Sequence, residues 1–111
     1  MKKLNTNDLY LLVQSFFDYK CRKVEFNLEK KEITCILYDS FLFSCGFADR
    51  YETFGAGLYI GQGILVKLLG KSSSLNNDED SIRKSLQIFD DYCRLRLPEK
   101  FLNAYDKAYK N

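Results

Sequence analysis

Histidine, the side chain that most often moves protons at neutral pH, does not occur among the 111 residues. Its absence excludes Ser-His-Asp triads, Cys-His pairs and zinc sites that use histidine. Acid–base chemistry would fall to carboxylates, lysine or tyrosine. Asp90 and Asp91 are adjacent in a segment of helical spacing, so their carboxylates point about 100° apart and cannot face one substrate. We interpret them as a solvated helix face and expect no enzyme.

The central glycines do not form a phosphate-binding loop. They are Gly55, Gly57, Gly61 and Gly63. Ile60 occupies the third glycine position of the Gly-x-Gly-x-x-Gly pattern, and Lys67 lacks the flanking glycine and Ser/Thr of a Walker loop. Turns and close backbone packing explain these glycines better, so we expect no cofactor.

The four cysteines, Cys21, Cys35, Cys45 and Cys93, include no Cys-x-x-Cys pair. Each of them lies in an apolar pattern, and free cysteine packs as a small hydrophobe. We therefore expect four buried free thiols and no metal.

Charge and hydropathy leave the choice of partner open. The chain has 17 basic and 15 acidic residues, a formal net charge of +2. No stretch approaches the roughly 20 apolar residues of a membrane span, and the polar residues after Met1 do not fit a secretory signal. These patterns predict a cytoplasmic protein without a membrane partner. The short basic clusters, Lys20, Arg22, Lys23, Arg94 and Arg96, leave nucleic-acid binding or a regulatory role as an alternative.

Aromatic residues favour a protein partner. The segment from Phe47 to Tyr59 alternates aromatic and charged residues beside the glycines, and Tyr92 follows two aspartates. Tyrosine combines a large contact area with a polar tip, which suits a surface that is wet when unbound. Each tyrosine could equally border the core.

The apolar pattern predicts an α+β fold in one domain, residues 1–111. Helical spacing runs from Thr6 to Cys21, capped by Asn5 or Thr6. Period-two patterns then predict an antiparallel meander of three or four strands. These strands cover Val24 to Leu28 (half-buried), Ile33 to Tyr38 (central), Phe41 to Phe47 and part of Tyr51 to Ile60, with a turn at Asp39-Ser40.

Helices are predicted after the sheet and packed on it. Ile64 to Leu69 has the length of a short helix ended by Gly70. Asn77 is a good N-cap for a second helix. The buried stripe of that helix consists of Ile82, Leu86, Phe89 and Cys93. Pro98 stops it and begins a last helix.

The C-terminal half resembles bacterial immunity proteins of contact-dependent growth inhibition (CDI) systems. The segments that carry the resemblance are Gly57-Leu-Tyr-Ile-Gly-Gln-Gly63, Leu69-Gly-Lys, Ser74 to Ser81, Ile88 to Leu102 and Tyr105 to Tyr109. The resemblance implies a protein that binds and neutralises one toxin domain, the C-terminal part of a large secreted CDI protein. Many such toxins are nucleases, and neutralisation would come from covering the active site or an adjacent surface.

An inhibitor of a nuclease often mimics its acidic substrate, but this chain has no acidic excess. Mimicry would therefore be local, and otherwise inhibition would depend on shape and aromatic anchors. The candidate toxin-binding residues are Asp49, Tyr51, Glu52, Phe54, Tyr59, Asp78, Glu79, Asp80, Asp90, Asp91 and Tyr92.

Overall fold

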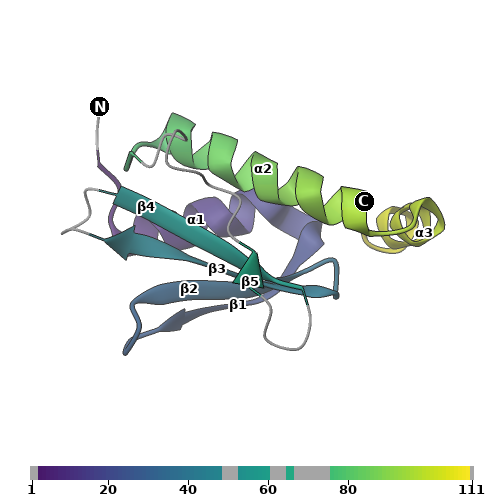
Figure 1. The fold of residues 1–111 in the computed structure, drawn as a ribbon, viewed down its shortest axis with the longest axis horizontal. Helices are drawn as coiled ribbons and strands as arrows, with labels where there is room; N and C mark the ends of the chain where they lie inside the picture. The colour runs from purple at the N-terminus through teal and green to yellow at the C-terminus, as the bar shows by residue number, and fades with distance from the viewer. Residues whose placement is uncertain (1–2, 49–52, 61–64, 67–75, 111) are drawn as a thin grey trace.

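The computed structural model describes residues 3–48, 53–60, 65–66 and 76–110, and within them the chain has the expected α+β arrangement (Figure 1). Its elements, in chain order, are the helix α1 (Thr6–Phe17), the 3-10 turn η1 (Asp18–Lys20), the strands β1 (Cys21–Asn27), β2 (Glu32–Leu37), β3 (Phe41–Ala48), β4 (Thr53–Tyr59) and β5 (Leu65–Val66), and the helices α2 (Glu79–Arg96) and α3 (Glu99–Tyr109).

The strands form one antiparallel sheet in the order β1-β2-β3-β4-β5, so the predicted meander is confirmed. Four strands have six to eight residues, and the two-residue β5 is added at the edge of β4. The helix predicted from Ile64 to Leu69 is wrong at the two positions that the structure describes. Leu65 pairs with Tyr59, and Val66 pairs with Leu58. A short apolar run is compatible with a strand as well as with a helix. Here the two residues pair with the edge of β4 and therefore form a strand.

Helices α1 and α2 lie on the same side of the sheet (Figure 1). In the core between the sheet and these helices, one aromatic ring from α1, one from β3 and one from α2 pack together. The Phe43 ring of β3 lies 5.5 Å from that of Phe17 and 5.1 Å from that of Phe89, both in edge-on geometry. Aromatic pairs at such spacing add specific contacts to the hydrophobic burial. This core fixes the position of α2 on the sheet.

The first helix is shorter than predicted. Asn5 caps it in a capping box with Asp8, as one of the two predicted caps. The helix ends at Phe17 because Asp18 has a positive φ of 51°, and Cys21 already belongs to β1. The predicted end at Cys21 is therefore wrong.

The alternating burial predicted from Val24 to Leu28 is also wrong. The register of β1 shifts between Arg22 and Glu25, and Lys23 has a φ of 53°, which marks a bulge. Phe26 is exposed and Leu28 leaves the strand, with 79% of its surface accessible. Because β1 is an edge strand and the bulge changes which face its side chains occupy, alternation alone does not bury them.

Helix α2 begins one residue later than predicted, with Asp78 as the N-cap. Asn77 instead is buried and holds the N-terminal segment of the chain. Its Oδ1 accepts from the Leu4 amide at 3.0 Å, and its Nδ2 donates to the Leu4 carbonyl at 2.8 Å. These two bonds bring the beginnings of α1 and α2 together. At the other end, Pro98 separates α2 from α3 as predicted.

Candidate protein-binding surface

Helix α2 has two apolar faces. The first is the predicted stripe of Ile82, Leu86, Phe89 and Cys93, all fully buried against the sheet and α1. The second face consists of Ile88, Tyr92 and Leu95, at the i, i+4, i+7 spacing that aligns side chains along a helix. Ile88 is 40% exposed, Leu95 is 86% exposed and Tyr92 is half-buried. We name these three residues the outer stripe.

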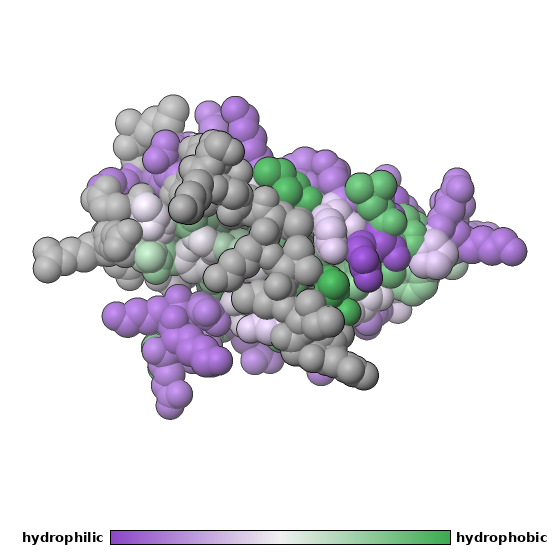
Figure 2. Space-filling view, in the orientation of Figure 1, coloured by the Kyte–Doolittle hydropathy of each residue, from purple (hydrophilic) through white to green (hydrophobic). Residues whose placement is uncertain are grey.

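The outer stripe has the composition of a protein interface. Figure 2 shows strongly hydrophobic side chains on the visible surface over α2, with hydrophilic ones beside them. The guanidinium carbon of Arg96 lies 5.9 Å from the centroid of the Tyr92 ring, which is within cation–π range. Asp91 is exposed and accepts a hydrogen bond of 2.8 Å from Gln87. Tyrosine, arginine and aliphatic anchors beside a carboxylate are the groups that carry binding energy between proteins.

Sequence reasoning selected Tyr92 and Asp91 but missed Ile88 and Leu95. The missed signal was a second apolar spacing within α2, offset from the buried stripe. Two apolar stripes on one helix look alike in the sequence. Which of them is buried depends on how the helix packs on the sheet, which the sequence does not specify.

The predicted aromatic segment does not form one surface in the residues that the structure describes. Asp49, Tyr51 and Glu52 lie outside those residues. Phe54 was wrong as a contact residue, because it is buried in the core with its ring 6.2 Å from that of Phe47. Tyr59 is half-buried and pairs with the exposed Leu42 of β3, away from α2.

Three predicted carboxylates gather at the start of α2, where the helix dipole stabilises negative charge. Asp78 is the N-cap and accepts from the Ser81 amide at 2.8 Å. Glu79 forms an ion pair of 2.9 Å with Arg83. Asp80 is exposed. Two of the three are thus engaged locally, and the group lies at the opposite end of α2 from Leu95.

Asp90 is not a surface residue, and its interpretation as part of a solvated helix face was wrong. Its accessible surface is only 3%. The Tyr38 hydroxyl donates to its Oδ1 at 2.5 Å, and the Lys20 ammonium donates to its Oδ2 at 3.3 Å. The buried carboxylate is therefore satisfied inside the protein and cannot contact a partner.

A polar clamp surrounds Asp90 and fastens α3 to the rest of the fold. We define it as Tyr19, Lys20, Tyr38, Asp90, Arg94 and Asp106. Arg94 donates at 3.1 Å both to the Tyr38 hydroxyl and to Asp106 Oδ2, and Tyr19 donates to Asp106 Oδ1 at 2.9 Å. The clamp joins η1, the turn after β2, α2 and α3.

The electrostatics of the clamp follow from these bonds. Burial raises the pKa of Tyr38, and the acceptor Asp90 raises it further. Burial would also raise the pKa of Asp106, but the hydrogen bonds from Arg94 and Tyr19 outweigh it and lower that pKa. The hydrogen bonds to Tyr38 and Asp106 raise the pKa of Arg94. The clamp thus holds a charged Arg94–Asp106 pair beside a neutral tyrosine.

The basic residues considered for nucleic-acid binding are divided among separate contacts. Lys20 and Arg94 belong to the clamp. Arg22 lies 3.3 Å from Asp39, and its guanidinium carbon is 4.4 Å from the centroid of the Tyr109 ring. Three of the five cations are thus neutralised by carboxylates of the same chain, which does not favour a shared basic face.

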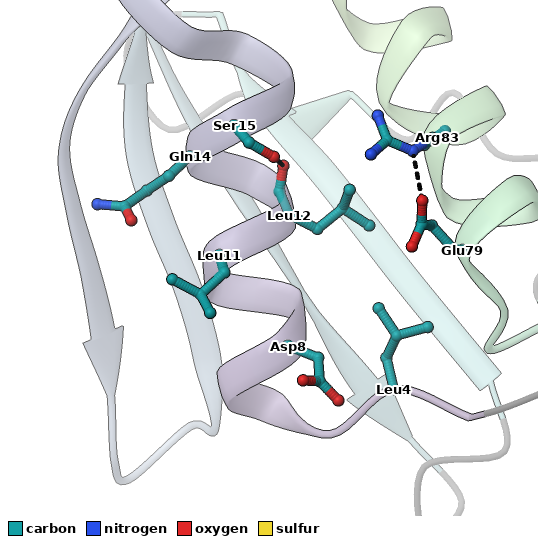
Figure 3. A pocket seen from close by; sticks show the side chains of 8 residues that line it. All are labelled: Leu4, Asp8, Leu11, Leu12, Gln14, Ser15, Glu79 and Arg83. Atoms are coloured by element: carbon teal, nitrogen blue, oxygen red, sulfur yellow. Dashed lines mark hydrogen bonds and ion pairs between the residues drawn. The ribbon is translucent and has the colours of Figure 1, made fainter.

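An open groove of about 670 Å³ lies along α1, beside the start of α2 (Figure 3). Its floor and rim combine apolar and polar side chains. They come from Leu4, Asp8, Leu11, Leu12, Gln14, Ser15, Glu79 and Arg83. Glu79 and Arg83 pair with each other across one helical turn, and Ser15 donates to the Leu12 carbonyl. Of the polar groups of the groove, Glu79 and Arg83 bond to each other and Ser15 bonds to the backbone, so they do not converge on one point.

Within the described ranges, no group of three or more His, Cys, Asp or Glu side chains could hold a metal ion. All four cysteines are free. Cys35, Cys45 and Cys93 are buried as predicted, whereas Cys21 is only half-buried. Among the helices in the described part of the chain, none has the length and apolarity to cross a bilayer.

Comparison of the chain with protein-family models, with curated proteins and with solved structures finds no match.

Proposed function

We propose that this chain is an immunity protein that binds one CDI toxin domain, a nuclease, and neutralises it by covering the active site or an adjacent surface. The proposal joins two lines of support. The first is the resemblance of the C-terminal half to such proteins, which includes most of α2. The second is the outer stripe on the same helix. The proposed site of action is the cytoplasm, and no cofactor, metal, membrane or nucleic acid takes part.

The outer stripe is the observation that carries the proposal. An exposed aliphatic side chain keeps its apolar surface in water, and each such surface gains free energy when a partner covers it. Leu95, at 86% exposure, and Ile88, at 40%, offer two such surfaces on either side of Tyr92 along one helix face. The stripe is rigid, because the opposite side of α2 is fixed in the core.

One carboxylate beside the outer stripe suits a cationic partner such as a nuclease. Asp91 is exposed and lies one residue before Tyr92, whose ring also has the Arg96 guanidinium near its face. Carboxylates at the rim of an interface steer association and fix its orientation more than they add affinity. In this proposal the apolar anchors hold the toxin, and the Asp91 carboxylate meets its basic nucleic-acid-binding surface.

The test first looks for the gene of a large CDI protein next to the gene of this chain and uses the C-terminal toxin domain of that protein. Cells that produce the toxin domain inside the cytoplasm should survive when they also produce this protein, and the two should co-purify. An unrelated CDI toxin domain is the control, against which no protection is expected. Loss of viability with both toxins, together with no complex in purification, would reject the proposal.

A further inference from the structure

Two of the four cysteines lie on neighbouring strands and on the same face of the sheet. Cys21 is opposite Leu37 in the β1–β2 register, and Cys35 lies two residues before Leu37 on β2. Side chains two residues apart on a strand share a face, so Cys21 and Cys35 are diagonal neighbours. The bulge between Arg22 and Glu25 lies opposite Cys35 and increases the local twist of β1.

The two thiols are diagonal neighbours on one face of the sheet and differ in access. Interaction with the other thiol is the largest cause of the pKa shift of each. The Cys21 thiol in turn reaches the Asp18 carbonyl at 3.5 Å. Cys35 is fully buried, whereas Cys21 is half-buried at the beginning of the edge strand. A reagent from solution can therefore reach Cys21 first.

The neighbouring thiol also favours Cys21 as the nucleophile. Interaction with the Cys35 thiol lowers the pKa of Cys21, although burial and the Asp18 carboxylate oppose it. That interaction and burial both raise the pKa of Cys35. Because the thiolate is the reactive form of cysteine, Cys21 is the more reactive of the two thiols. Cys35 lies beside it as a second thiol that remains protonated.

The other two thiols provide an internal comparison. Burial raises the pKa of Cys45, and burial with the nearby Asp90 raises the pKa of Cys93 to about 12. Both are buried in the core. Neither combines access with an ionisable sulfur, so both should remain unmodified in the folded protein.

We propose that Cys21 is a site of reversible modification by low-molecular-weight disulfides such as oxidised glutathione, and that Cys35 resolves the product into a Cys21–Cys35 disulfide. In the first step the Cys21 thiolate attacks one sulfur of glutathione disulfide, which forms a mixed disulfide and releases one glutathione thiolate. In the second step the Cys35 thiol gives up its proton and attacks the Cys21 sulfur, which releases the second glutathione. The two protein thiols lose two electrons together, and one glutathione disulfide becomes two glutathione thiols.

The test is a peptide map of the intact folded protein after incubation with oxidised glutathione. The remaining thiols are alkylated after unfolding. The expected product is a disulfide-linked pair of peptides containing Cys21 and Cys35, with Cys45 and Cys93 alkylated, and dithiothreitol should reverse it. In the Cys35→Ser variant, glutathione should remain on Cys21. The Cys93→Ser variant, which leaves the pair intact, should still form the disulfide.

The wild-type map alone decides the proposal, so it does not depend on the folding of any variant. Recovery of all four thiols in the alkylated form would overturn it. So would a linkage that involves Cys45 or Cys93 instead, or glutathione that persists on Cys21 of the wild-type protein without forming the disulfide.

Discussion

The Tyr38 hydroxyl, in the turn between β2 and β3, donates a hydrogen bond of 2.5 Å to the buried carboxylate of Asp90 in α2. This bond spans 52 residues of sequence and joins the sheet to the helix that carries the outer stripe. The Lys20 ammonium forms an ion pair with the second carboxylate oxygen of Asp90. The exposed face of α2 thus depends on a buried polar anchor beneath it.

Replacement of Asp90 by alanine should destabilise the protein by about 2–3 kcal/mol, because it leaves the Tyr38 hydroxyl and Lys20 without their shared acceptor. Lys20 is partly accessible to water, which limits the loss. Urea unfolding followed by circular dichroism measures the change. Asp91→Ala is the matched control on the exposed face and should change stability by less than about 0.5 kcal/mol. Equal losses in the two variants would contradict the role assigned to Asp90.

The Arg94–Asp106 pair predicts a pH dependence of stability. The pKa of Asp106 is lower in the folded protein than the ordinary carboxyl value of about 3.9. A lowered pKa contributes stability that is fully present above the unfolded value and is lost as the pH falls through the folded value. The charged or titratable groups near Asp106 are Arg94, Tyr19 and Lys110. The Asp106→Asn variant should therefore lose less stability than the wild type on acidification.

Urea midpoints at pH 7 and pH 3 measure this effect. The difference between wild type and Asp106→Asn should be clear at pH 7 and smaller at pH 3. Asp91→Asn removes one exposed carboxylate and controls for the change in net charge. A difference between wild type and Asp106→Asn that is the same at both pH values would show that the pair does not contribute as described.

Two glycines of the sheet should respond oppositely to alanine. A Cβ atom on Gly46 would lie 2.8 Å from the Lys31 carbonyl oxygen, which is closer than backbone atoms allow. Gly46→Ala should therefore cost about 1–3 kcal/mol through a forced backbone shift. A Cβ atom on Gly55 meets no atom within 4 Å. Gly55→Ala should leave stability unchanged or raise it by up to about 1 kcal/mol, because alanine loses less backbone entropy. Thermal unfolding of both variants tests the contrast.

Local patterns were sufficient to predict most of the fold. The buried stripe from Ile82 to Cys93 follows the 3.6-residue period over three turns, and Pro98 marks its end unambiguously. Alternation predicted β3 well because this strand lies inside the sheet under both long helices. The same alternation failed for β1, since its position at the edge leaves Phe26 exposed whatever its spacing.

The site was less predictable because its residues depend on contacts far apart in the chain. Asp90 and Asp91 are the same residue type at adjacent positions, and the way α2 packs in the fold buries Asp90 beside Tyr38 and leaves Asp91 exposed. Ile88 and Leu95 have the composition of core residues, and their exposure results from the depth to which α2 packs on the sheet. Tertiary placement, rather than residue type, decides these cases.

The outer stripe should carry the binding energy for the toxin domain. Leu95→Asp places a charge at its most exposed apolar position and should weaken binding by at least about 2 kcal/mol, or about 30-fold in Kd. Stability should change little, because the Leu95 side chain is 86% exposed in the free protein. Leu28→Asp is the matched control, a leucine 79% exposed after β1.

The most direct measurement is titration calorimetry of the wild-type protein, Leu95→Asp and Leu28→Asp with the C-terminal toxin domain of a CDI protein whose gene adjoins that of this chain. The account predicts tight binding by the wild type and Leu28→Asp and a loss of at least about 30-fold for Leu95→Asp. Binding of Leu95→Asp as tight as that of the wild type, or no binding by the wild type itself, would contradict it.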